Sequence, residues 1–223
     1  MFSMRRFGLW VSVPRNDAAL TRAAVEAGAD VIKIHMAVEH RASGNCFGTL
    51  DEERERILTV VQAAAGRPVG LVTGGSVEAA PDLEAVKTLG VAFVSMYAHH
   101  TPACWLSGRA PLPIMVAPNF ETPLPLLRDL GASGIDMLEA SVMPPTGYGQ
   151  RLTVADLALY RHIRREVPVP IVVPSQRRIL PEDIPALAAT GVDAVMIGAV
   201  VTGQSAASIA EATAAFRRAI DRL

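Results

Sequence analysis

The chain has 223 residues, of which half are hydrophobic and few are aromatic, and its formal net charge is −1. A chain of this length and apolar content can bury one sizeable core without splitting, so residues 1–223 are expected to form a single domain. The balanced charge and scattered basic residues give no indication of a nucleic-acid or membrane-surface partner. No apolar run reaches about 18 residues, which argues against a transmembrane helix. We therefore expect a cytoplasmic protein.

Two further features of the sequence narrow the class. Cys46 and Cys104 lie far apart and form no CxxC pair, so neither a disulfide framework nor a zinc site is indicated. The start of the chain places two arginines before an apolar run, a weak likeness to a signal peptide. Because this run is short and lacks a small-residue cleavage site, we interpret it as a first strand.

Short apolar runs alternate with helical segments along the whole chain. The expected strands are Leu9–Val13, Val31–His35, Val69–Thr73, Val91–Tyr97, Ile114–Ala117, Ile135–Glu139, Ile171–Val173 and Ala194–Gly198. The expected helices are Asp17–Ala27, Leu50–Ala65, Ala80–Leu89, a short one near Cys104–Leu106, Leu124–Leu130, Thr153–Glu166, Pro181–Ala189 and Ser205–Arg222. Continuously apolar strands are typical of a parallel sheet covered on both faces. The alternation predicts a (βα)8 barrel, with a doubly wound open sheet as the alternative.

Every second expected strand begins in the same way, which indicates four βαβα quarters. These strands follow a glycine in the segments EAGADVIKIHM, TLGVAFVSMY, DLGASGIDMLE and ATGVDAVMIGA. Glycine is the residue expected at a left-handed helix cap. Aligning the four segments on their first glycine predicts an inward layer of Lys33, Ser95, Asp136 and Met196, followed two residues later by His35, Tyr97, Leu138 and Gly198.

The active site of a (βα)8 barrel is built at the carboxyl ends of the strands, where Lys33 and His35 fall. Both are expected to face the interior, because a lysine beneath the helix layer would be an unpaired buried charge. Across the barrel, a carboxylate is expected to face Lys33. The alignment gives Asp136, but an inserted Ser133-Gly134 pair would turn Glu139 inward instead.

These residue types suggest catalysis. Lys33 is interpreted as a base, an electrophilic stabiliser or a Schiff-base amine, with a lumen ion pair that only fills the barrel as the alternative. His35 is interpreted as an acid, a base or a holder of a substrate oxygen, or else as a core histidine. Of the adjacent His99 and His100, at most one is expected to face the site. His40 is interpreted as an ordinary loop residue.

Two regions at the same end of the barrel are candidates for ligand binding. The long glycine-bearing loops of residues 38–49 and 143–152 are interpreted as lids or as plain connections. The turns after the seventh and eighth strands often bind phosphate in such barrels. We therefore select four candidate phosphate-binding residues: Ser175, Gln176, Gly198 and Ala199.

A family resemblance appears in the last quarter of the chain. The run RILPEDI at residues 178–184, followed by GVDAVMIGAVVTG, resembles the ribulose-phosphate-binding barrels, such as indole-3-glycerol-phosphate synthase, thiamine-phosphate synthase and N-acetylmannosamine-6-phosphate 2-epimerase. The resemblance implies a substrate phosphate held by Gly198 and Ala199. However, Ser175-Gln176 replaces the usual glycine pair, and VGLVTGG lacks the lysine that the epimerase and the indole synthase carry on the third strand. Their mechanisms are therefore not carried over.

The sequence predicts an enzyme for a small phosphorylated metabolite, a sugar phosphate or similar carbonyl compound, acting as an isomerase or epimerase, or as an aldolase-like lyase. Lys33, His35 and Asp136 or Glu139 would carry the reaction, without a cofactor, in a homodimer or higher homo-oligomer. One alternative is a metal-dependent barrel that uses His35, His99 or His100 with Glu139. The other alternative is a non-catalytic barrel that binds a phosphorylated ligand.

Overall fold

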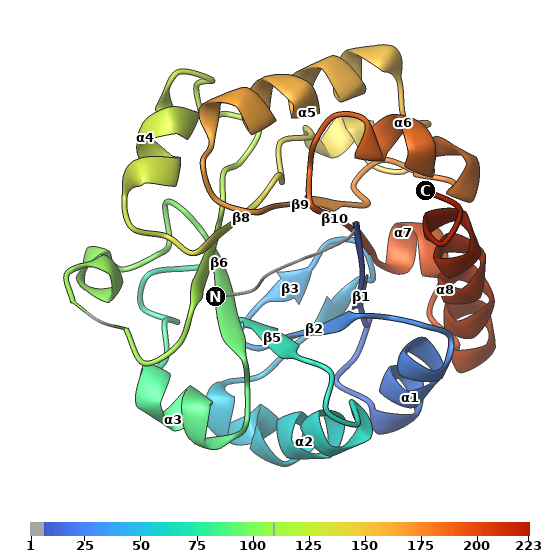
Figure 1. Cartoon of the computed structure of the whole chain (residues 1–223). Coiled ribbons are helices and arrows are strands. Elements are labelled where there is room, and N and C mark those ends of the chain that lie inside the picture. Colours follow the sequence, from blue (N-terminus) through green and yellow to red (C-terminus); the bar gives the residue numbers. More distant parts are fainter. Residues whose placement is uncertain (1–6, 109) are drawn as a thin grey trace.

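Eight parallel strands close into a barrel in the computed structural model, which describes residues 7–108 and 110–223 (Figure 1). Residues 1–6 and 109 of the predicted domain lie outside the described residues. The barrel strands are β1 (Gly8–Ser12), β2 (Val31–His35), β5 (Val69–Val72), β6 (Phe93–Tyr97), β7 (Ile114–Ala117), β8 (Met137–Glu139), β9 (Ile171–Pro174) and β10 (Ala194–Ile197). The ring closes because β1 pairs with both β2 and β10. The predicted (βα)8 barrel is confirmed.

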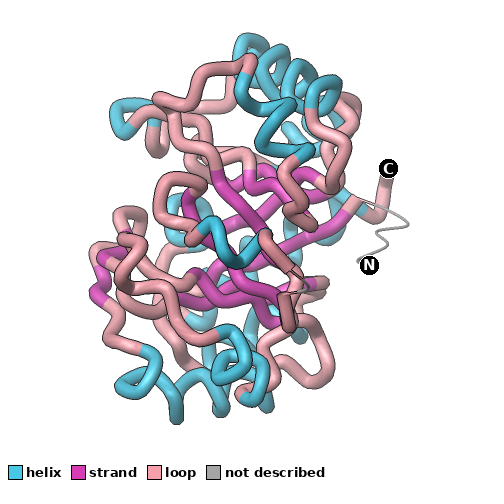
Figure 2. The backbone as a smooth tube through the Cα atoms, turned by 90° about the vertical axis from the view of Figure 1, so that its left-hand side faces the viewer, coloured by secondary structure: helices cyan, strands magenta, loops and turns pink. Residues whose placement is uncertain are grey.

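Helices surround the barrel and cover its outer face (Figures 1 and 2). The α-helices are α1 (Ala18–Glu26), α2 (Leu50–Ala63), α3 (Leu83–Thr88), α4 (Leu126–Ala132), α5 (Val154–Glu166), α6 (Ile184–Ala188), α7 (Ala199–Thr202) and α8 (Ala206–Ile220), and the 3-10 helices are η1 (Ala103–Leu106), η2 (Pro145–Gly147) and η3 (Pro181–Asp183). The short helices η2 and α7 are absent from the predicted set. Within the described ranges, no helix has the length and hydrophobicity needed to span a membrane.

The loop after β2 forms a hairpin that the sequence analysis did not predict. It pairs β3 (Glu39–His40) with β4 (Asn45–Cys46), and Gly44 adopts a φ of +69° in the turn. The Asn45 side-chain amide donates to the Pro14 carbonyl (2.9 Å), and the Gln204 side-chain amide donates to the Ser43 carbonyl (3.0 Å). The hairpin is therefore anchored to the loops that follow β1 and α7.

Two apolar cores hold the barrel together. One lies between the strands and the helices. The other fills the lower barrel lumen and consists of Trp10, Val31, Phe93, Met115, Met137, Val172, Ala194 and Met196, which we call the lower layer. Gly70 permits this packing, because a Cβ atom there would lie 2.1 Å from the Phe93 ring. Such dense apolar packing closes the amino-terminal end of the lumen.

The alignment that placed Asp136 in the lumen is wrong, because it used the wrong glycine. The left-handed residue before β8 is Gly134 (φ +97°), whereas Gly131 lies inside α4. Asp136 consequently sits just before β8, is exposed, and accepts a hydrogen bond from the Ile114 N–H (2.8 Å). Asp30 and Asp193 make the same 2.8 Å contact to backbone N–H groups in their own quarters, so Asp136 belongs to a structural repeat.

Candidate active site at the barrel mouth

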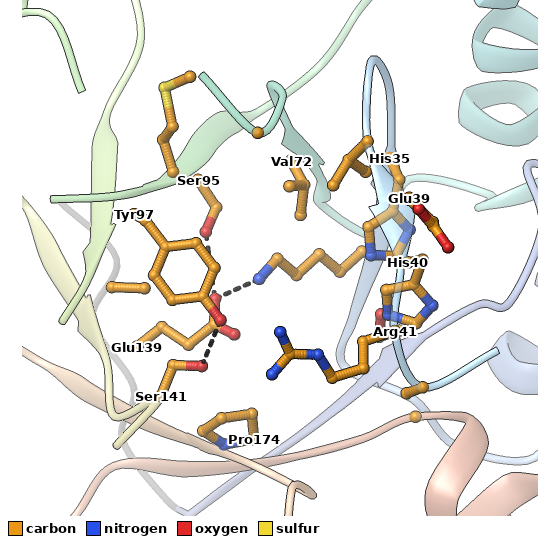
Figure 3. A pocket seen from close by; sticks show the side chains of 18 of the residues that line it. His35, Glu39, His40, Arg41, Val72, Ser95, Tyr97, Glu139, Ser141 and Pro174 are labelled. Carbon is orange, nitrogen blue, oxygen red and sulfur yellow. Dashed lines mark hydrogen bonds and ion pairs between the residues drawn. The ribbon is translucent and has the colours of Figure 1, made fainter. Parts of the chain in front are cut away.

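A cavity of about 600 Å³ opens at the carboxyl ends of the barrel strands (Figure 3). Its floor carries polar residues two positions beyond the lower layer: Ser12 after Trp10, Lys33 after Val31, Ser95 after Phe93 and Glu139 after Met137. We call these four residues the upper layer. Strand residues two apart point the same way, so one face of each of these four strands supplies both layers.

Lys33 and Glu139 form an ion pair at the floor of the cavity. The Lys33 ammonium donates to Glu139 Oε2, and the side chains are only 4% and 10% exposed. The Ser95 hydroxyl donates to the same oxygen (3.1 Å). The predicted lysine–carboxylate pair is therefore present, with Glu139 as the carboxylate. Holding a charged pair at the floor of an open cavity is unusual for a purely structural contact, because buried ion pairs add little stability.

The end of β2 is fixed by a buried amide next to His35. The Asn16 side-chain amide donates to the His35 carbonyl (2.7 Å), and its oxygen accepts from the His35 N–H (3.2 Å). The same Asn16 amide donates to Glu53 Oε2 (2.9 Å), and the other Glu53 oxygen accepts from the Gly48 N–H (3.3 Å). This network ties the strand end to both ends of the loop that follows it.

His35 and His40 lie against each other on the cavity wall, with their ring planes tilted by 44°. Their ring centroids are 4.3 Å apart, and Phe47 lies 4.9 Å from the His35 ring. Burial, then His40 and Lys33, hold the pKa of His35 well below its ordinary value. Burial, followed by the charge of Lys33, lowers the pKa of His40 to about 4. Both rings are therefore neutral near pH 7. The buried Nδ1 of His35 has no hydrogen-bond partner within the described part of the chain.

A hydrogen-bonded group links the far wall of the cavity to the loop after β8. The Gln176 side-chain amide donates to Ser141 Oγ (2.9 Å) and to the Tyr148 hydroxyl (2.8 Å), while its oxygen accepts from the Met143 N–H (3.0 Å). The Tyr97 hydroxyl lies 3.3 Å from Ser141 Oγ. Burial raises the pKa of Tyr97 to about 12, so its hydroxyl stays protonated.

The four residues selected for phosphate binding all line the cavity, but only some of their hydrogen-bond donors are free to contact a ligand. The Gly198 N–H already donates to Ser175 Oγ (2.9 Å). The amide of Gln176 is fully engaged with protein groups, which does not support a direct phosphate contact from it. Ser175 retains its hydroxyl hydrogen, and Ala199 begins α7, where the first N–H groups have no acceptor within the helix.

His40 and Arg41 were given no site role from the sequence, and they reach the cavity through the hairpin. The glycine at position 44, which allows the turn, is a sequence signal that could have indicated the hairpin. His100 lines the cavity while His99 is exposed, in agreement with the expectation that at most one of the two faces the site. Among the residues that the structure describes, no three His, Cys, Asp or Glu side chains form a group suited to a metal ion.

No protein family model and no curated protein sequence matches the chain. Solved structures do. Thiamine phosphate pyrophosphorylase from Pyrococcus furiosus is 18% identical, with a TM-score of 0.70 over 97% of this chain and 96% of that chain. Tryptophan synthase from Mycobacterium tuberculosis is 15% identical, with a TM-score of 0.72 over 96% and 93%. Phosphoribosyl anthranilate isomerase from Thermus thermophilus is 14% identical, with a TM-score of 0.69 over 97% and 99%. The chain therefore shares the (βα)8-barrel fold of these proteins.

Proposed function

We propose that the protein is an enzyme that acts on a small phosphorylated carbonyl compound, with Lys33 at the chemical step. The observation that carries this proposal is the buried pair of Lys33 and Glu139 on the floor of an open cavity. A buried lysine in contact with a carboxylate at the floor of a cavity is a frequent arrangement at reactive sites. The depth of the pair suits a substrate of a few carbons that reaches down to Ser95.

The arrangement favours proton abstraction next to the carbonyl, as in an isomerase or epimerase. The Lys33 ammonium would stabilise the negative charge that develops on the carbonyl oxygen, because it is a cation held in place by Glu139 at the floor of the cavity. The neutral His35 ring, which lines the cavity beside Lys33, would accept the substrate proton. Glu139, held by Ser95, would keep the ammonium in place.

A second route, aldolase-like cleavage, is favoured by the direct Lys33–Glu139 contact. Lys33 would pass a proton to Glu139, its free amine would attack the carbonyl carbon, and loss of water would leave an imine. Glu139 would return its proton to the hydroxyl that leaves as water, so that the imine is protonated. This imine would then accept the electron pair of the carbon–carbon bond that breaks and become an enamine, while the Glu139 carboxylate takes the β-hydroxyl proton of the fragment that leaves as a carbonyl compound. The two routes differ in one observable: only the second forms a covalent adduct with Lys33.

For the phosphate, we propose the end of the cavity formed by Ser175 and Ala199. The Ser175 hydroxyl can donate to a phosphate oxygen while it accepts from the Gly198 N–H. The Ala199 N–H adds a backbone donor at the start of α7. Gln176 would act indirectly by holding Ser141 and Tyr148.

The test is deuterium exchange from D₂O into a panel of phosphorylated ketoses and keto acids, followed by NMR. We expect at least one compound to exchange its α-proton with the wild-type protein and not with Lys33→Met. Borohydride trapping and mass spectrometry of the Lys33 peptide would separate the two routes. If no compound in the panel exchanges or forms an adduct, while phosphorylated ligands still bind, the enzyme proposal fails in favour of a binding protein.

A further inference from the structure

Four charged side chains line the cavity: Lys33, Glu39, Arg41 and Glu139. Lys33 and Glu139 neutralise each other, and the neighbouring histidines are neutral near pH 7. Arg41 projects from the hairpin into the cavity, and among residues 7–108 and 110–223 it makes no ion pair and no hydrogen bond (Figure 3). The Glu39 carboxylate lies on the far side of the histidine rings from the Arg41 guanidinium in this view. An uncommitted guanidinium in a cavity is suited to an anionic ligand group.

The turn after β9 offers a phosphate only uncharged donors, and few of them are free. Ser175 Oγ takes up the Gly198 N–H, and the Gln176 amide is occupied by three protein groups. The helix α7 has only four residues, so few aligned peptide dipoles add to its field. A phosphate monoester carries close to two negative charges, and these donors include no cation to balance them.

Gln176, which has no free donor for a phosphate, holds the Tyr148 ring against which Arg41 lies. Its amide donates to the Tyr148 hydroxyl (2.8 Å), which fixes the Tyr148 side chain at the rim. The Arg41 guanidinium carbon lies 5.8 Å from the centre of the Tyr148 ring, within the range of a cation–π contact. The guanidinium is therefore positioned next to the β9 turn through two successive contacts, from Gln176 to Tyr148 and from Tyr148 to Arg41.

We propose that Arg41, stacked on Tyr148, binds the phosphate of the substrate and supplies the charge that the β9 turn lacks. This inference rests on the proposed function, which it makes more specific. The ligand is a phosphate monoester, bound by two parallel N–H donors of the Arg41 guanidinium. Because Arg41 belongs to the hairpin, bound phosphate would also hold the hairpin over the cavity.

The probe is inorganic phosphate, titrated at constant ionic strength and followed by ³¹P NMR line broadening and by the thermal midpoint. We expect Arg41→Gln to weaken phosphate binding by roughly 10- to 100-fold, the loss of a charge-assisted contact. Arg41→Lys keeps the positive charge without the planar guanidinium, so its phosphate affinity should lie between those of the wild type and Arg41→Gln. Tyr148→Leu removes the aromatic ring next to Arg41 and should weaken phosphate binding by several fold. The thermal midpoint measured without phosphate shows whether this variant folds.

The matched control is Arg15→Gln, since Arg15 is exposed in the loop after β1 and does not line the cavity. It should bind phosphate as the wild type does. Equal weakening in Arg15→Gln and Arg41→Gln would overturn the proposal in favour of a diffuse charge effect. Unchanged binding in Arg41→Gln would overturn it while leaving a phosphate site elsewhere in the cavity. If the wild type binds no phosphate, this inference and the phosphorylated substrate both fail, and the Lys33 chemistry is then judged with unphosphorylated carbonyl compounds.

Discussion

The lower and upper layers of the barrel lumen lie one above the other, yet they differ in polarity and in packing. The lower layer is apolar and closely packed, with Gly70 making room for Phe93. The upper layer is polar, with Lys33, Ser95 and Glu139 joined by hydrogen bonds beneath an open cavity. The lower layer contributes hydrophobic stabilisation, whereas buried polar groups contribute little. On β1, β2, β6 and β8, stability and chemistry are thus separated by two residues along the strand.

The largest expected effect comes from making the upper layer resemble the lower one. In the double variant Lys33→Met/Glu139→Leu, the free energy of unfolding should be unchanged or higher by about 1–4 kcal/mol, because apolar residues often replace a buried ion pair at no loss. Exchange activity should fall by about 100- to 10,000-fold, since both groups of the proposed chemical step are lost. Urea unfolding and the deuterium exchange assay measure the two quantities.

The single variant Glu139→Leu provides the control for this experiment. It leaves the Lys33 ammonium buried without its partner, which should cost about 3–5 kcal/mol, toward the lower end because the cavity admits water. If the double variant is destabilised as strongly as the single one, the pair supports the fold, and the separation of the two layers is wrong.

A smaller effect should come from pH, to which the apolar lower layer cannot respond. Because the pKa of His40 falls from 6.5 to about 4 on folding, the unfolded chain gains a proton below pH 6.5 that the folded chain does not. This contribution to stability is therefore fully present above pH 6.5 and is lost as pH falls toward 4. Between pH 7.5 and 5, the wild type should lose roughly 1–2 kcal/mol more than His40→Gln. Parallel stability curves for the two proteins would contradict the partly buried, neutral state of His40.

The fold was predictable because strand hydrophobicity and the glycines before alternate strands are local signals. The inward residue lies five positions after a left-handed glycine in each quarter: Gly28 to Lys33, Gly90 to Ser95, Gly134 to Glu139 and Gly191 to Met196. DLGASGID offers two glycines, and only packing distinguishes them, since a Cβ at Gly131 would lie 2.9 Å from Pro168. His40 was missed because the hairpin contacts that bring it to His35 are tertiary.

The smallest expected effect separates the two carboxylates that the sequence left open. Asp136→Ala should lower the free energy of unfolding by about 1 kcal/mol, because the Ile114 N–H loses its acceptor. Asp136→Asn keeps an acceptor oxygen, so its free energy of unfolding should be close to that of the wild type. Both should retain exchange activity, whereas Glu139→Gln should lose most of it, because an uncharged amide cannot hold the ammonium or take its proton. Loss of activity in Asp136→Asn without loss of stability would give Asp136 a role that its place outside the lumen does not provide.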